Sequence, residues 1–70
     1  MAKRQRPDRC TVIVAYDHEL EKYVDLLVTE HNGPRNFTAI DREGFEYDMS
    51  VYDNYVQTPP SYPWKGIKVA

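Results

Sequence analysis

Hydrophobic positions first gather at residues 10–16, where the chain reads CTVIVAY. A short run rich in β-branched residues is typical of a buried strand. Residues 1–9, before this run, have no hydrophobic periodicity and contain a proline. They therefore predict a flexible arm without secondary structure of its own.

Residues 17–31 place their hydrophobic positions at helical spacing and predict an amphipathic helix. Asp17 is a good N-cap, and Asn32-Gly33-Pro34 would end the helix, because glycine suits the left-handed C-cap and proline cannot continue it. The alternative is a strand over residues 23–30, but Leu27 interrupts the alternation that a half-buried strand requires. The hydrophobic stripe consists of Leu20, Tyr23, Val24, Leu27, Val28 and His31.

Residues 36–41 and 44–53 predict two strands of a hairpin. The link from Asp41 to Gly44 fits a type I turn with glycine in the left-handed position, a common way to close a hairpin. In the second strand hydrophobic and polar residues alternate, so one face is expected to pack inward. The inward-facing positions are Phe45, Tyr47, Met49 and Val51.

Residues 57–63 (QTPPSYP) are rich in proline and predict an extended, polyproline-like tail. Trp64, Ile67 and Val69 give this tail side chains to bury, and residues 65–69 could add a short edge strand. These elements predict a single α+β domain over residues 10–56, with the arm at 1–9 and the tail at 57–70 packing on the domain. The alternative is a small all-β barrel. In the α+β prediction the helix (Leu20, Val24, Leu27, Val28) packs on the sheet (Val12, Val14, Phe37, Ala39, Phe45, Tyr47, Met49, Val51).

Charge is sorted along the 70 residues. The first ten residues sum to +3, residues 11–56 to −7 and residues 57–70 to +2, which gives the net charge of −2. A basic arm on an acidic body can dock onto a surface of mixed charge. Four cations alone would hold a nucleic acid only weakly at physiological salt, and the acidic body would repel it.

The chemistry-bearing residues do not form a catalytic or metal-binding pattern. Cys10, His18 and His31 lack zinc-site spacing, and the acids of residues 41–48 lack the length and glycine placement of an EF-hand loop. We therefore expect no metal, no cofactor and no enzymatic activity. The chain opens on charged residues without a signal-peptide pattern, and its single cysteine cannot form an internal disulfide. A cytoplasmic protein is expected.

Two short motifs have competing interpretations. Residues 3–6 match K-R-x-R, which could grip phosphates, or could be a solvated tail. Residues 59–62 match the PPxY form bound by WW domains, and residues 60–65 resemble a PxxPxK ligand of SH3 domains. The competing interpretation is a tail that wraps the domain and seats Trp64 against the core.

The function that the sequence favours is a non-enzymatic regulator or inhibitor, of the kind that phages encode, bound to a larger protein machine that handles nucleic acid, such as RNA polymerase or a nuclease. Direct nucleic-acid binding through the arm is the alternative, and a small enzyme is a third hypothesis. The arm is expected to steer docking, and exposed aromatic side chains to anchor it. The predicted partner-binding residues are Lys3, Arg4, Arg6, Arg9, Tyr52, Tyr55, Tyr62 and Trp64.

Overall fold

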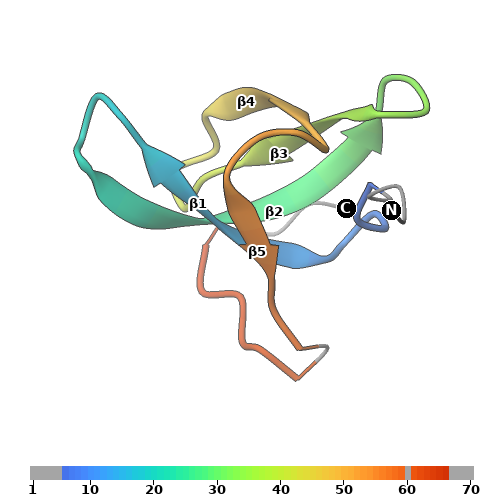
Figure 1. Ribbon diagram of the computed structural model, residues 1–70. Helices are drawn as coiled ribbons and strands as arrows, with labels where there is room; N and C mark the ends of the chain where they lie inside the picture. The colour runs from blue at the N-terminus through green and yellow to red at the C-terminus, as the bar shows by residue number, and fades with distance from the viewer. Residues whose placement is uncertain (1–5, 60, 67–70) are drawn as a thin grey trace.

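The computed structural model describes residues 6–59 and 61–66, and these form one antiparallel sheet of five strands (Figure 1). The strand order is β4-β3-β2-β1-β5. No helix occurs among the described residues, so the predicted α+β class is wrong and the small all-β alternative fits. For the same residues, no helix is long and apolar enough to cross a membrane. The strands are β1 (Val12–Asp17), β2 (Lys22–His31), β3 (Asn36–Ile40), β4 (Glu46–Ser50) and β5 (Tyr55–Gln57).

The predicted helix over residues 17–31 is replaced by a turn and the long strand β2. This strand pairs with β1 from Val12↔Leu27 to Asp17↔Lys22. Leu26 and Leu27 are both buried although they face opposite sides of the sheet. Leu27 interrupts the simple alternation because the outer face of the sheet is covered as well. The helical spacing was therefore a consequence of two-sided burial.

The side chain of Asp17 explains why a helix cap was expected at this position. Its Oδ1 accepts hydrogen bonds from the backbone N–H groups of Glu19 (2.8 Å) and Leu20 (3.1 Å). Carboxylate-to-amide bonds of this kind close turns as well as helix ends. Here they close the β1–β2 turn, in which Glu21 adopts a positive φ of 53°.

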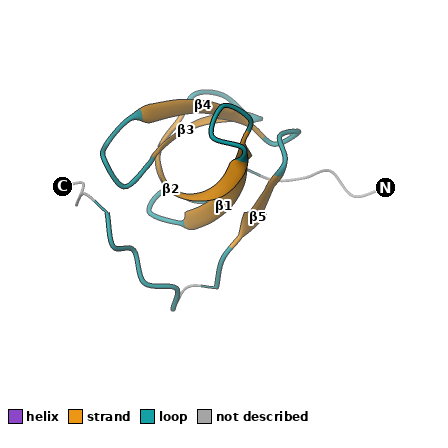
Figure 2. Cartoon of the chain, turned by 90° about the vertical axis from the view of Figure 1, so that its left-hand side faces the viewer, coloured by secondary structure: helices purple, strands orange, loops and turns teal. Residues whose placement is uncertain are grey.

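The sheet curls around its inner face, as Figure 2 shows, and this face holds the larger core cluster. Phe37 and Tyr55 meet edge to face across it, with ring centroids 5.5 Å apart. A register shift between Val28 and Glu30 interrupts the β2–β3 ladder, and such a bulge increases local bend and twist. The buried members of the cluster are Ile13, Ala15, Leu26, Val28, Phe37, Ala39 and Tyr55.

A second, smaller cluster lies on the outer face and is covered by the proline-rich tail. Val12, Leu27 and Ile40 form this cluster, and Tyr62 and Trp64 pack against it. Residue 66 is the last described, so the predicted edge strand over residues 65–69 falls largely outside the described residues. The tail thus supplies the second covered face that β2 requires.

The predicted hairpin of β3 and β4 is present. The Gly44 N–H donates to the Asp41 carbonyl (3.1 Å), and the φ of Gly44 is 93°, the left-handed conformation expected there. Tyr47 and Met49 pack against the inner core, as predicted. Phe45 does not, because it precedes β4 and is 66% exposed.

Residues 6–10 of the chain pack against the end of β2. Pro7 is fully buried, and its carbonyl accepts a hydrogen bond from His31 Nε2 (2.8 Å). Arg6 Nη1 donates to the Gly33 carbonyl, and the Cys10 N–H donates to the Val28 carbonyl (2.8 Å). Residues 6–10 are therefore held by hydrogen bonds to the His31 ring and to the backbone carbonyls of Gly33 and Val28.

Candidate functional site

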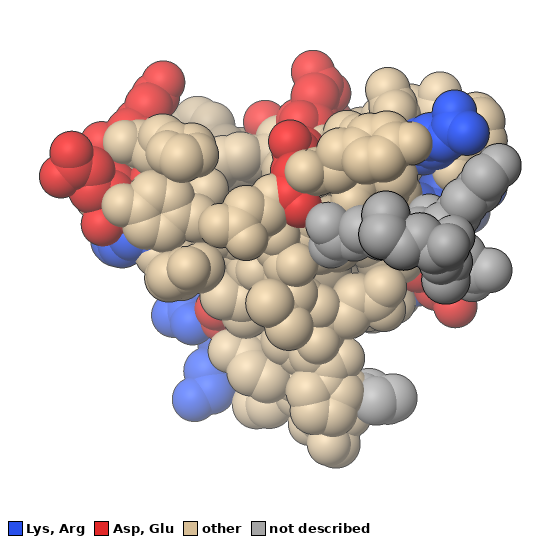
Figure 3. Space-filling model, viewed as in Figure 1, with Lys and Arg blue, Asp and Glu red and all other residues tan. Residues whose placement is uncertain are grey.

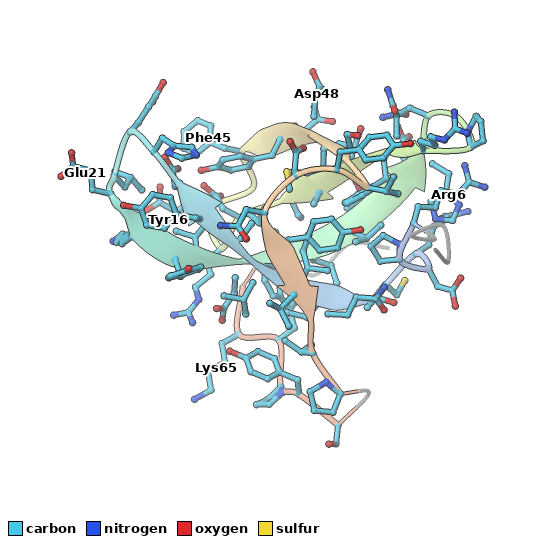
Figure 4. The ribbon with its side chains drawn as sticks, viewed as in Figure 1. Arg6, Tyr16, Glu21, Phe45, Asp48 and Lys65 are labelled. Carbon is cyan, nitrogen blue, oxygen red and sulfur yellow. The ribbon has the colours of Figure 1, made fainter. Side chains whose placement is uncertain are left out.

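The β1–β2 and β3–β4 connections lie at the same end of the molecule, on the left in Figure 1 and facing the viewer in Figure 2. We call this end, made of residues 16–25 and 41–47, the hairpin end. Figure 4 labels Tyr16, Glu21 and Phe45 here and Arg6 on the opposite side. The hairpin end therefore lies away from the basic residue Arg6.

Three large hydrophobic side chains are exposed at the hairpin end. Leu20 is 56% exposed, Tyr23 is 61% exposed and Phe45 is 66% exposed. Tyr23 is paired across the strands with Tyr16, and their rings meet edge to face with centroids 5.1 Å apart. His18 contacts the ring of Tyr16 in the same manner, at 5.0 Å. Aromatic pairs of this geometry stabilise one another and fix the orientation of the exposed rings.

An outer groove separates the β1–β2 turn from the β3–β4 turn, with a volume of about 330 Å³. Leu20 and Tyr23 line one side, and Asp25 lies between Arg42 Nη2 (2.7 Å) and the Tyr62 hydroxyl (3.1 Å), which both donate to its Oδ2. The hydrogen bond to Asp25 raises the pKa of Arg42 and also that of Tyr62. This shared carboxylate joins the groove to the tail.

A second hollow, which we call the mouth pocket, opens between the curled edges of the sheet. Its volume is about 190 Å³. The Tyr47 hydroxyl donates to Asp17 Oδ2 (3.0 Å) at this pocket. Burial, followed by this hydrogen bond and the charges of nearby carboxylates, raises the pKa of Tyr47 to about 12. The pocket is lined by Ala15, Tyr16, Asp17, His18, Val24, Leu26, Tyr47, Met49, Asp53 and Asn54.

Carboxylates outnumber cations at the hairpin end. Figure 3 shows red carboxylates gathered on the left, where Figure 4 labels Glu21. The cations of this end are Lys22 and Arg42, and Arg42 is paired with Asp25. The carboxylates are those of Asp17, Glu19, Glu21, Asp25, Asp41, Glu43 and Glu46. The exposed hydrophobic side chains are thus surrounded by negative charge.

The structure separates the residues that the sequence grouped as a partner-binding set. Arg6 lies on the opposite side from the hairpin end, and Arg9 is exposed in the turn that precedes β1. Lys3 and Arg4 lie outside the described residues. Arg6 therefore does not share one surface with the exposed hydrophobic side chains of the hairpin end, whereas Arg9 lines a hollow together with Gly44 and Glu46.

The four predicted aromatic anchors have different environments. Tyr52 is 74% exposed in the β4–β5 connection, whereas Tyr55 is buried in the inner core and is not available as an anchor. Tyr62 and Trp64 are half-buried on the outer face. Because Tyr62 packs there and donates to Asp25, the tyrosine of the PPxY motif is engaged within the chain.

Sequence reasoning missed the aromatic residues of the hairpin end. Tyr16 and Tyr23 lie at equal distances from the centre of the β1–β2 turn, so a hairpin would have placed them opposite one another. The helix prediction concealed this signal, because it assigned Tyr16 to a strand and Tyr23 to a helix.

Among the described residues, no group of three or more His, Cys, Asp or Glu side chains is arranged to hold a metal ion. Comparisons with models of protein families, with curated proteins and with solved structures find no match to this chain.

Proposed function

We propose that this protein is a non-enzymatic regulator that binds a larger protein through its hairpin end. The observation that carries the proposal is the exposure of Leu20, Tyr23 and Phe45 at one acidic end of a small domain. Exposed large hydrophobic side chains rimmed by polar groups mark interaction surfaces, and aromatic residues are frequent anchors of protein interfaces. Each such side chain, once fully buried, contributes about 1.5–3 kcal/mol.

The carboxylates around these side chains define the partner surface. They favour a basic rim on the partner and oppose a polyanion at the same place. Proteins that handle nucleic acid, such as RNA polymerase or a nuclease, carry basic channels of this kind. The proposed role is therefore regulation or inhibition of such a machine in the cytoplasm, as small phage-encoded proteins do.

Capture from a lysate of the protein's own cell or host, treated with nuclease, tests the proposal. The bait is the tagged full chain, and bound proteins are identified by mass spectrometry. We expect a protein that the wild type retains and that the Tyr23→Ser, Phe45→Ser double variant retains at least about tenfold less, equivalent to ~1.4 kcal/mol. Tyr52→Ser is the control, because Tyr52 is 74% exposed but lies in the β4–β5 connection, outside the hairpin end.

Two results would contradict this proposal. The first is equal retention of the partner by the wild type and the double variant. The second is loss of all bound material after nuclease treatment, combined with direct binding of nucleic-acid oligomers that weakens steeply with salt. That second result would favour the basic residues Arg6 and Arg9 as the binding groups.

A further inference from the structure

The mouth pocket has an apolar floor and a polar rim, which differ in chemistry. The floor consists of side chains from the inner face of the sheet: Ala15, Val24, Leu26 and Met49. The rim carries the carboxylates of Asp17 and Asp53 beside the aromatic residue Tyr47. A ligand that fits both parts has a hydrophobic stem and a polar or charged head.

The size of the pocket limits what it can hold. Its volume of about 190 Å³ is below the ~300–1,000 Å³ of pockets that bind whole cofactors or drug-sized ligands. It suits one long side chain better than a complete small-molecule substrate. Its position at the hairpin end, beside Tyr16 and His18, places it next to the exposed hydrophobic side chains that the proposed partner would cover.

The charge at the rim is negative. Among the described residues that line the pocket there is no lysine or arginine. Asp17, Asp41 and Glu19 all act on the Tyr47 hydroxyl and help to raise its pKa. Protein donors already orient both rim carboxylates: Tyr47 and the β1–β2 turn bind Asp17, and the Ser50 N–H donates to Asp53 Oδ2 (2.7 Å). Carboxylates held in this way are preorganised to receive a cation.

Tyr47 adds a second attraction for a cation. Aromatic faces bind ammonium groups through the ring quadrupole, and methylated ammonium groups are bound in the same way. Asp17 Oδ2 accepts one hydrogen bond, from Tyr47, and a carboxylate oxygen has a further lone pair to offer.

From this geometry we propose that the mouth pocket receives a lysine side chain of the protein partner, with its methylene stem on the apolar floor and its ammonium group against Asp17, Asp53 and Tyr47. The inference rests on the proposed function, because it assigns one subsite to the same partner surface. Methylation of that lysine keeps the positive charge and preserves binding. Acetylation removes the charge and weakens binding.

Nuclear magnetic resonance of the ¹⁵N-labelled full chain tests this site directly. The probes are three capped Gly-Ser-Gly-Lys-Gly-Ser-Gly peptides, in which the lysine is unmodified, trimethylated or acetylated. We expect saturable shifts of the amide signals of Val24, Leu26 and Met49 with the first two peptides. The acetylated peptide should bind at least about tenfold more weakly, since it lacks the charge.

Asp17→Asn is the decisive variant, because asparagine keeps the shape and the turn-closing oxygen of aspartate but not its charge. It should weaken binding of the unmodified peptide at least about tenfold, whereas the control Tyr52→Leu should leave binding unchanged. Retained dispersion of the amide signals shows that each variant is folded. Should Asp17→Asn unfold the chain, Asp53→Asn takes its place with the same expectation.

Absence of saturable shifts with the charged peptides would overturn the lysine site. So would equal binding of the acetylated peptide, or unchanged binding by the charge-removing variant. None of these results affects the capture experiment, because Tyr23 and Phe45 do not line the mouth pocket. The lysine site can thus be wrong while the proposed protein-binding function is correct, and the two failures are distinguishable.

Discussion

Asp17 shows how one side chain links a turn to a pocket. Its Oδ1 closes the β1–β2 turn and its Oδ2 receives the Tyr47 hydroxyl. The backbone N–H of Leu20 contributes most to lowering the pKa of Asp17, with Tyr47 and Glu19 adding to it. A lowered pKa means that this stabilisation is present above the ordinary value of 3.8 and is lost as the pH falls below it. The sequence revealed that Asp17 caps backbone amides, but not which element it caps.

Tyr47 predicts a loss of stability at alkaline pH. Its pKa is raised from 10.0 to about 12 in the folded protein, so the unfolded chain loses this proton first. The contribution of the protonated Tyr47 hydroxyl to the free energy of unfolding is therefore complete below pH 10 and disappears as the pH rises from 10 to 12. Urea unfolding between pH 8 and 12 should show this decline for the wild type and a shallower one for Tyr47→Phe.

At pH 7 the same Tyr47→Phe substitution should lower the free energy of unfolding by about 1 kcal/mol, the usual worth of a hydrogen bond. If the free energy of unfolding declined identically at alkaline pH in the wild type and in Tyr47→Phe, the assignment of this decline to the Tyr47 hydroxyl would be wrong.

At the scale of elements, the sequence located β1 and the β3–β4 hairpin, and it misassigned β2. For β1 the predicted inner face was wrong: Ile13 and Ala15 lie in the inner core, whereas Val12 lies on the outer face. The hairpin was predictable because its alternation and its glycine turn are local signals. The secondary structure of residues 22–31 could not be predicted locally, because the distant tail covers Leu27 on the outer face. A strand that buries side chains on both faces has a hydrophobic pattern that resembles that of a helix. Neither the groove nor the pocket could be predicted, since both require the correct pairing of Tyr16 with Tyr23.

The space around Gly66 shows how closely the tail packs on the rest of the domain. A Cβ at this position would clash with Trp64 Cζ2 and would lie 2.8 Å from the Cα of Arg42, closer than side chains approach. Gly66→Ala should therefore displace the indole ring and lower the free energy of unfolding by about 1–3 kcal/mol. Urea unfolding and the fluorescence of Trp64, the one tryptophan of the chain, measure both effects.

Gly33→Ala is the matched control for this substitution, because a Cβ there meets no atom within 4 Å. It should leave both the stability and the tryptophan emission close to those of the wild type. Equal stability and identical emission of the wild type and Gly66→Ala would show that the tail is not seated as described.

At the scale of the whole molecule, the sorting of charge along the sequence is only partly a sorting in space. The carboxylates concentrate at the hairpin end, but Lys22 and Arg42 share it, and Arg6 and Pro7 are hydrogen-bonded to Gly33 and His31 at the opposite end. Charge sums along the chain could not reveal this, because they ignore which backbone groups hold the basic segment. The basic segment is therefore structural as well as charged.

Deletion of residues 1–9 should accordingly destabilise the domain. It removes the buried Pro7, the hydrogen bond from His31 to its carbonyl, and the contact between Arg6 and Gly33, so we expect a loss of roughly 2–3 kcal/mol. Chemical unfolding of the shortened and full chains measures it. Arg9→Ser, at an exposed position, should have no such effect and isolates the role of charge. An unchanged midpoint for the shortened chain would contradict this structural role.

The seating of Tyr62 on the outer face has a consequence for recognition of the tail by other proteins. A WW domain could bind the proline motif only after the tail had detached from the sheet. Detachment exposes Val12, Leu27 and Ile40 to solvent. Proteolytic cleavage of the tail would also expose this outer cluster, and an exposed hydrophobic surface promotes self-association. The segment that reads in the sequence as a binding motif therefore covers the outer face of the sheet in the folded chain. Cleavage of this segment would favour aggregation of the protein.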